Sequence, residues 1–170
     1  MSAGALVVAG TDTGVGKTVV SAMLALALDA VYWKPVQSGN ADGGDTESVR
    51  RWTGLGEDRF LAEAYSLTRP LSPHRSAELD GVRIDPERLK ELPRTRRRLV
   101  VELAGGLLVP WTEDFLQIDA LSRWRAPVVL VARTGLGAIN HCLLSIEALA
   151  FRRIPLQGLL FVGKAGEDSE

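Results

Sequence analysis

Cysteine is almost absent from this chain: Cys142 is the only one in 170 residues, which excludes an intramolecular disulfide and a cysteine-rich metal site. Neither sign of charge dominates, because 20 Lys and Arg residues oppose 21 Asp and Glu residues, and this balance gives no indication of nucleic-acid binding. Apolar runs such as residues 22–28 are far shorter than the roughly 18 residues that cross a bilayer. The first residues also lack the basic segment of a signal peptide. These absences predict a soluble, cytoplasmic protein with no nucleic-acid partner and no membrane partner.

Short apolar segments alternate with helical ones along the chain. Strands are predicted at residues 5–9, 31–34, 98–102, 127–131 and 156–162. Helices are predicted at residues 18–28, 45–52 and 139–152, and another is predicted to begin at Pro86 with Asp85 as its N-cap. Residues 64–81 lack a clear period and are expected to form a long ordered loop, with room for a short strand at 64–67. Strands separated by helices predict an α/β fold with a mainly parallel sheet and helices on both faces.

One segment carries a specific motif. Residues 10–18 read Gly-Thr-Asp-Thr-Gly-Val-Gly-Lys-Thr and match the phosphate-binding pattern G-x-x-x-x-G-K-[ST] between a predicted strand and a predicted helix. In such a loop the backbone N–H groups and the helix N-terminus hold phosphate oxygens. Lys17 can reach the β- and γ-phosphates, and the Thr18 hydroxyl can ligate Mg²⁺. The motif therefore predicts an ATP-handling, P-loop NTPase-like domain, taken to span residues 1–170 as one unit.

Three further residues are expected at the carboxyl ends of strands or shortly after them, where open α/β sheets bind ligands. Lys34 ends the second predicted strand, where it could neutralise a phosphoryl group or an anionic substrate; an isolated Lys-Pro pair is more often found at the surface. Glu102 is predicted to end an apolar strand, where a carboxylate is costly unless it is paired or bound to a cation. Together with Asp45 and Thr18 it would form a hard-oxygen site suited to Mg²⁺, whereas alone it could be a helix-cap or ion-pair partner.

Five segments together resemble the dethiobiotin synthetase family. They are the phosphate loop at residues 10–18, Lys-Pro-Val-Gln-Ser-Gly at 34–39, Ser-Pro-His at 72–74, Glu-Leu-Ala-Gly-Gly-Leu-Leu-Val-Pro at 102–110 and Arg-Thr-Gly-Leu-Gly-Ala-Ile-Asn-His at 133–141. The segments occur in the family's order and cover essentially the whole chain. The phosphate loop is shared with many ATPases, whereas the segments at 34–39 and 133–141 are much more discriminating.

The resemblance implies a ligase reaction in biotin biosynthesis. The family closes the ureido ring of dethiobiotin from 7,8-diaminononanoate, CO₂ and ATP, with Mg²⁺ as cofactor. A substrate amine takes up CO₂ as a carbamate, and a carbamate oxygen attacks the γ-phosphorus to give a carbamic-phosphoric anhydride. The second amine then closes the ring and expels phosphate. Such a route needs positive charge and close positioning from the protein more than acid–base machinery.

The resemblance also implies roles for individual residues. Lys17 would contact the phosphates, and Lys34 would lie between the carbamate and the γ-phosphate as the catalytic lysine. The metal ligands would be Thr18, Asp45 and Glu102. The residues in contact with ATP would be Gly14, Val15, Gly16, Lys17, Thr18, Val19, Asp45, Glu102, Leu103, Ala104 and Gly105.

The diamine substrate would contact two separate groups of residues. Thr13 and Ser38 would hold its carbamate or diamine end. Its carboxylate tail would be received at the start of a helix, by Gly137, Ile139 and Asn140, because a helix N-terminus suits an anion. In the family this tail contact crosses a dimer interface, so the resemblance implies a homodimer.

The chain departs from the family's pattern at two residues and at its end. Gly14 stands where many members have glutamate, and Leu103 stands where the motif Glu-Gly-Ala-Gly-Gly has its first glycine. If that position needs positive φ, leucine would cost roughly 1–3 kcal/mol. The family continues for several tens of residues and uses them for part of the adenine pocket. The chain is thus expected to lack this C-terminal part, to end in the acidic first turn of a helix at 167–170, and to select poorly among bases.

Two alternatives remain open from the sequence. One is a catalytically impaired nucleotide-binding module of the same fold, in which Leu103 and the absent C-terminal part prevent turnover. The other is a related cobyrinate-type P-loop synthetase, although neither a glutamine-amidotransferase domain nor a cysteine nucleophile is evident for it.

Overall fold

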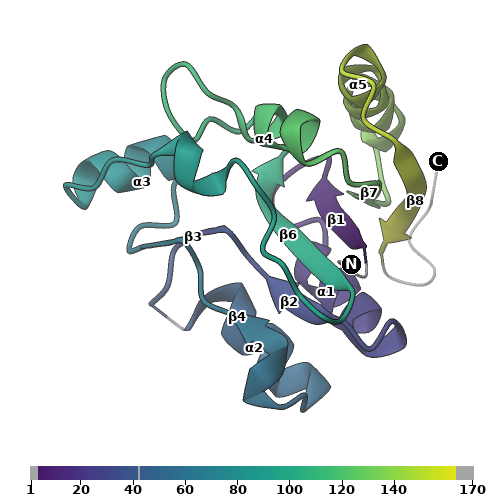
Figure 1. The fold of residues 1–170 in the computed structure, drawn as a ribbon. Helices are drawn as coiled ribbons and strands as arrows, with labels where there is room; N and C mark the ends of the chain where they lie inside the picture. Colours follow the sequence, from purple (N-terminus) through teal and green to yellow (C-terminus); the bar gives the residue numbers. More distant parts are fainter. Residues whose placement is uncertain (1–3, 42, 164–170) are drawn as a thin grey trace.

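A parallel sheet forms the centre of the chain in a computed structural model that describes residues 4–41 and 43–163 (Figure 1). Every strand pair recorded in the sheet is parallel. In spatial order its strands are β4 (Phe60–Leu61), β2 (Val31–Trp33), β6 (Leu99–Gly106), β1 (Ala5–Gly10), β7 (Val128–Arg133) and β8 (Leu156–Val162). A smaller parallel pair joins β3 (Val36–Ser38) to β5 (Tyr65–Leu67). Parallel strands direct their carboxyl ends to one edge, so residues that follow them can meet there.

Helices cover both faces of the sheet (Figure 1). On one face, α1 (Lys17–Ala27) and α2 (Gly44–Thr53) pack through Val20, Ala22 and Val49 against one apolar cluster. On the other face, α3 (Pro73–Leu79), α4 (Gln117–Trp124) and α5 (Ala138–Phe151) pack against a larger cluster. The central strands are apolar at consecutive positions because both of their faces are buried, as β1 and β7 show. No helix in the described part of the chain is both long and apolar enough to cross a membrane.

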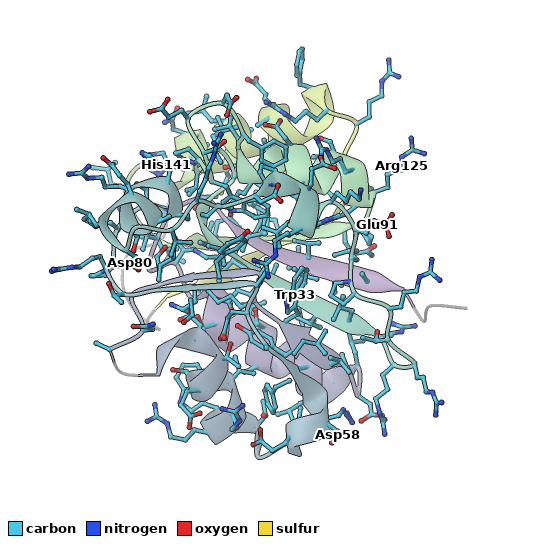
Figure 2. The ribbon with its side chains drawn as sticks, turned by 60° about the vertical axis from the view of Figure 1, so that its left-hand side comes forward. Trp33, Asp58, Asp80, Glu91, Arg125 and His141 are labelled. Carbon is cyan, nitrogen blue, oxygen red and sulfur yellow. The ribbon has the colours of Figure 1, made fainter. Side chains whose placement is uncertain are left out.

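Trp33 belongs to the larger cluster and lies in β2, the strand next to the β4 edge of the sheet. It lies inside the molecule (Figure 2), with 5 % of its surface exposed, and its ring packs 6.1 Å from that of Trp124 in α4. Its indole N–H donates to the carbonyl of Ala62 over 3.1 Å. Because Trp33 immediately precedes Lys34, this packing fixes the direction in which the chain leaves β2.

The strands and helices predicted around the phosphate loop are confirmed, and so is the α/β class. The prediction of a loop over residues 64–81 is wrong in part: it contains β5, as allowed for, and also α3, whose first residue is Pro73. The helix predicted at Asp85 is only a 3₁₀ turn, Pro86–Leu89, although Asp85 does cap it by accepting from the N–H of Glu87 over 2.9 Å. The predicted turn at 167–170 lies outside the described residues.

Two further elements correct the sequence-based prediction. Glu102 does not end its strand: β6 continues to Gly106, with an irregularity in its pairing to β1 after Val8. Helix α4 was not predicted at all. Its N-terminus is capped because the carboxylate of Asp119 accepts from the N–H of Leu116 over 2.9 Å, a local signal that was present in the sequence.

Candidate active site

A cleft of about 790 Å³ opens at the carboxyl edge of the sheet, above the phosphate loop. Its walls come from the phosphate loop and α1, from the segments after β2 and before α3, and from β6 and the turn that follows it. The residues that line it are Thr13, Gly14, Gly16, Lys17, Thr18, Val19, Lys34, Gln37, Ser38, Asp45, Trp52, Pro70, Leu71, Ser72, Pro73, Glu102, Ala104, Gly105 and Val109. The cleft therefore gathers most of the residues that the sequence pointed to.

The phosphate loop is tied to the sheet and closely packed against it. The N–H of Thr11 donates to the carbonyl of Val131 in β7 over 2.9 Å. Gly16, which precedes α1, has a φ of +95°, and a Cβ at this position would lie 2.8 Å from Cγ1 of Val162. Glycine is needed here for both reasons, because an L side chain would be strained and would also collide with the end of β8. The loop and Lys17 thus line the cleft.

Lys34 lies at the centre of the charged groups. It is 2 % exposed, which contradicts the expectation of a surface residue that an isolated Lys-Pro pair would give. Its Nζ lies 2.6 Å from Oδ2 of Asp45 and 3.2 Å from Oε1 of Glu102. Burial would lower the pKa of this ammonium, but the charges of Glu102 and Asp45 outweigh burial and raise the pKa. Lys34 is therefore a buried cation held between two carboxylates.

Thr18, Asp45 and Glu102 form a cluster of oxygens beside Lys34. The Thr18 hydroxyl lies 3.2 Å from Oδ1 of Asp45 and 2.9 Å from Oε1 of Glu102. Burial favours the neutral form of Asp45, but the charge of Lys34 and hydrogen bonds from Lys34 and Thr18 outweigh it and lower the pKa. The side chain of Gln37 holds Asp45 in place, because its Oε1 accepts from the backbone N–H of Asp45 over 3.0 Å. The structure thus brings the three predicted metal ligands together.

Glu102 is the most deeply buried carboxylate of the cluster, at 1 % exposure. Its Oε2 accepts from the hydroxyl of Tyr32 over 3.0 Å. Burial and the neighbouring charge of Glu102 raise the pKa of Tyr32 well above its usual value, so the phenol stays protonated and donates. Sequence reasoning did not identify Tyr32.

Lys17 is the second lysine that lines the cleft. It is 7 % exposed, and its Nζ donates to the carbonyl of Asp12 over 2.8 Å. Burial and the neighbouring positive charge of Lys34 lower the pKa of Lys17 to about 8. An anion bound between Lys17 and Lys34 would oppose both effects, because it favours the charged form of each lysine.

Several predicted residues do not line the cleft. The side chains of Val15 and Leu103 are each 1 % exposed and belong to the two apolar clusters. Leu103 also has no positive φ, so the strain expected from replacing a glycine there does not arise. Gly137 precedes α5, as predicted, with Ile139 and Asn140 in the first turn, but these three residues lie outside the cleft.

Other residues of the site were missed by sequence reasoning. Gln117 is fully buried, and its side-chain amide donates to the carbonyls of Ala104, over 2.7 Å, and Gly106. It therefore holds the end of β6, which forms one wall of the cleft. Residues 70–73 form another wall of the cleft. The Ser-Pro-His segment at 72–74, which contributed to the family resemblance, could have indicated this wall from the sequence.

The fold and the site define a P-loop α/β protein whose cleft holds two lysines and the oxygens of Thr18, Asp45 and Glu102. A family model described as an AAA domain matches residues 4–170. A protein of Rhodopseudomonas palustris strain BisB5 named ATP-dependent dethiobiotin synthetase BioD is 61 % identical over 165 residues, covering 97 % of this chain and 77 % of the relative. One of the same name from Bradyrhizobium diazoefficiens is 57 % identical, with 97 % and 78 % covered. The chain belongs to the dethiobiotin synthetase family.

Solved structures support the fold independently. The kinase domain of Escherichia coli tyrosine kinase ETK superimposes with a TM-score of 0.55 at 17 % identity, covering 99 % of this chain and 71 % of that one. A ParA family ATPase from Chlorobium tepidum gives a TM-score of 0.51 at 11 % identity, with 99 % and 76 % covered. At these identities the likeness concerns the P-loop α/β fold alone.

Proposed function

We propose that this chain is an ATP-dependent dethiobiotin synthetase, a ligase that forms carbon–nitrogen bonds by closing a ureido ring on 7,8-diaminononanoate with CO₂. The observation that carries the proposal is the meeting of Lys17, Lys34 and the Thr18–Asp45–Glu102 cluster in one cleft behind a phosphate loop. The relatives named dethiobiotin synthetase support it, because they are more than half identical over nearly the whole chain.

Lys17 and Lys34 provide the positive charge that phosphoryl transfer to a carbamate requires. We assign Lys17 to the phosphates of ATP, since it extends from the first turn of α1 beside the phosphate loop. We assign Lys34 to the space between the carbamate and the γ-phosphate. Its raised pKa keeps it an ammonium that can stabilise charge on both anions as the carbamate oxygen approaches phosphorus.

Ser38 and Thr13 are assigned to the reacting end of the diamine. Both line the cleft, and the hydroxyl oxygen of Ser38 is buried without a hydrogen-bond partner among the described residues. An unpartnered buried hydroxyl is costly unless a ligand completes its hydrogen bonding. Ser38 therefore suits a contact with the carbamate or an amine, which would hold the second amine near the carbonyl carbon for ring closure.

The oxygens of Thr18, Asp45 and Glu102 fit Mg²⁺. They are hard ligands, and the Thr18 hydroxyl lies within 3.2 Å of an oxygen of Asp45 and of an oxygen of Glu102. Asp45, with 34 % of its side chain exposed, is the more accessible of the two carboxylates. An ion bound with ATP would be held by these three residues and would neutralise charge on the phosphates. In this arrangement the protein's contribution is to hold the oxygens in place, and the lowered pKa of Asp45 favours its ionised form.

The substrate's carboxylate tail is assigned to the start of α5. Gly137, Ile139 and Asn140 lie in or just before its first turn, where the N–H groups of a helix lack partners within the helix and suit an anion. Because these residues lie outside the cleft of their own chain, we propose that a second copy supplies them and that the enzyme acts as a homodimer.

Product formation tests the proposal. The chain is incubated with Mg-ATP, bicarbonate and 7,8-diaminononanoate, and dethiobiotin and phosphate are measured; equal amounts of the two are expected. Lys34→Ala should abolish dethiobiotin formation, whereas Lys90→Ala, which changes a lysine with 54 % of its side chain exposed, should not change it. ATP hydrolysis without dethiobiotin would instead favour an impaired nucleotide-binding module, and absence of both would refute the proposal.

A further inference from the structure

Tyr32 does not line the cleft, yet its hydroxyl contacts one of the groups that do. It is fully buried in β2, and its backbone is in register with Val100 of β6. Glu102 lies two residues further along β6 and so points to the same face of the sheet as Val100. A diagonal neighbour on the next strand is within reach of a long aromatic side chain. The hydroxyl of Tyr32 accordingly donates to Oε2 of Glu102 over 3.0 Å.

The two oxygens of Glu102 therefore have different partners. Oε1 accepts from the Thr18 hydroxyl over 2.9 Å and from Lys34 over 3.2 Å, both of which line the cleft. Oε2 has Tyr32 as its one hydrogen-bond donor among the described residues. Since Glu102 is 1 % exposed, water has little access to replace that donor, and an unsatisfied carboxylate oxygen at this depth is costly.

The packing around Tyr32 fixes the direction of its hydroxyl. The edge of its ring meets that of Phe60 at 61°, with the ring centroids 6.2 Å apart. The guanidinium of Arg50 lies 5.0 Å from the centroid of the Phe60 ring, in the arrangement of a cation–π contact. Tyr32 is therefore held both by the packing of its ring on Phe60 and by the hydrogen bond of its hydroxyl, so it can keep Glu102 in position.

We infer that Tyr32 is a positioning residue for the metal site: its hydroxyl fixes the rotation of the Glu102 carboxylate, so that Oε1 stays turned toward Thr18. The inference rests on the proposed binding of Mg²⁺ by Thr18, Asp45 and Glu102. Tyr32 acts through Glu102 and touches neither nucleotide nor metal. Groups that orient a metal-ligating side chain typically contribute about 10–100-fold to metal affinity.

Tyr32→Phe tests this role, because it removes the hydroxyl and keeps the ring that packs on Phe60. Mn²⁺ is titrated into the ADP-bound protein, and free Mn²⁺ is measured by electron paramagnetic resonance. The dissociation constant for Mn²⁺ should rise about tenfold or more, while the affinity for ADP without metal should not change. Tyr65→Phe is the matched control, since it also removes a buried hydroxyl, one that accepts from Asp85 N–H, and should leave Mn²⁺ binding unchanged. Unchanged Mn²⁺ affinity in Tyr32→Phe would overturn the inference.

A second variant separates this inference from the proposed metal site. Glu102→Gln should weaken Mn²⁺ binding, and the double variant Tyr32→Phe/Glu102→Gln should bind no more weakly than Glu102→Gln alone, because Tyr32 acts through Glu102. If Glu102→Gln leaves Mn²⁺ binding intact, the metal site is wrong and the role of Tyr32 fails with it. If Glu102→Gln weakens binding but Tyr32→Phe does not, only the role of Tyr32 is wrong.

A spectroscopic measurement keeps the test valid if Tyr32→Phe fails to fold. The chain has two tyrosines, so incorporation of 3-fluorotyrosine into the Tyr65→Phe variant labels Tyr32 alone. The ¹⁹F resonance should shift when Mg²⁺ is added to the ADP-bound protein, because the Glu102 carboxylate then shares its charge with the metal. A resonance that does not move at saturating Mg²⁺ would overturn the inference.

Discussion

Nζ of Lys34 lies 2.6 Å from Oδ2 of Asp45, and the two side chains are exposed to very different degrees, 3 % and 34 %. The lysine is thus a buried cation whose charge is balanced by one carboxylate at the cleft surface and by a second, Glu102, in the interior. This relationship explains how a lysine that follows a buried strand can remain charged. It also makes the stability of the fold depend on a group that we assign to catalysis.

Replacing Lys34 should therefore destabilise the protein as well as inactivate it. Lys34→Met leaves Glu102 buried without its counter-charge, which typically costs about 3–5 kcal/mol of unfolding free energy. Urea denaturation measures the change. Lys34→Met/Glu102→Gln should recover a large part of the loss, because no unpaired charge then remains buried. Equal stability of Lys34→Met and the wild type would show that the pair does not contribute as described.

Nucleotide affinity should decrease above pH 8 because of Lys17. Burial and Lys34 lower the pKa of Lys17 to about 8, whereas bound phosphates favour its charged form and so raise that pKa. The affinity for ATP should thus be nearly constant just below pH 8 and should fall by up to about tenfold per pH unit above it. The fall should stop at the pKa that Lys17 has in the nucleotide-bound protein. Calorimetric titrations between about pH 7.5 and 9.5 measure this dependence. Lys17→Arg keeps its charge over this range and should show a flat profile. If Lys17→Arg shows the same decline as the wild type, the titrating group is not Lys17.

Gly10→Ala should weaken nucleotide binding by moving Lys17. A Cβ at Gly10 would lie 2.8 Å from Nζ of Lys17 and 2.8 Å from the carbonyl oxygen of Asp12. The lysine and the loop backbone would both have to shift, and loss of about 1.4 kcal/mol of binding energy would lower the affinity tenfold. Gly54→Ala is the control: it also strains the backbone, at a φ of +63°, but a Cβ there meets open space, so ATP affinity should not change. Wild-type ATP affinity in Gly10→Ala would contradict this reading of the loop.

Leu103→Gly restores the residue of the family motif and should harm the protein. Leu103 is 1 % exposed within the larger apolar cluster and has no positive φ, so the glycine would relieve no strain and would leave a cavity. A loss of roughly 3–5 kcal/mol of unfolding free energy is expected, with no gain in the rate of dethiobiotin formation. Leu79→Ala, at a leucine that is 51 % exposed, should change stability by about 0.5 kcal/mol or less. A Leu103→Gly variant that is as stable and more active would contradict the packing described here.

Local signals predicted much of this site. The phosphate loop is recognised from consecutive residues. Lys34 follows the apolar strand β2, and Glu102 interrupts the apolar strand β6; the carboxyl ends of both strands meet at one edge of the parallel sheet. The expectation that these residues would come together needed only the fold class. The same holds for Asp45, which lies in the first turn of a helix that could be recognised from its charges.

The remaining contacts depend on tertiary structure. Tyr32 reaches Glu102 only because β2 and β6 are neighbours in the register that pairs Tyr32 with Val100. Gln117 supports the cleft from a helix that is too short for a periodic pattern to reveal. The family motif predicted backbone strain at Leu103, whereas the effect of this residue on stability depends on the packing of its side chain in the core.

Transfer of oxygen from CO₂ to phosphate tests the central proposal most directly. With ¹⁸O-labelled CO₂, 7,8-diaminononanoate and Mg-ATP, a single turnover should give dethiobiotin and phosphate in equal amounts. Attack by the carbamate oxygen on the γ-phosphorus predicts one ¹⁸O in each released phosphate and one in the ureido carbonyl, measured by mass spectrometry. Phosphate that carries no ¹⁸O, or release of phosphate without dethiobiotin, would contradict the assignment of Lys17, Lys34 and the oxygen cluster to ureido ring closure.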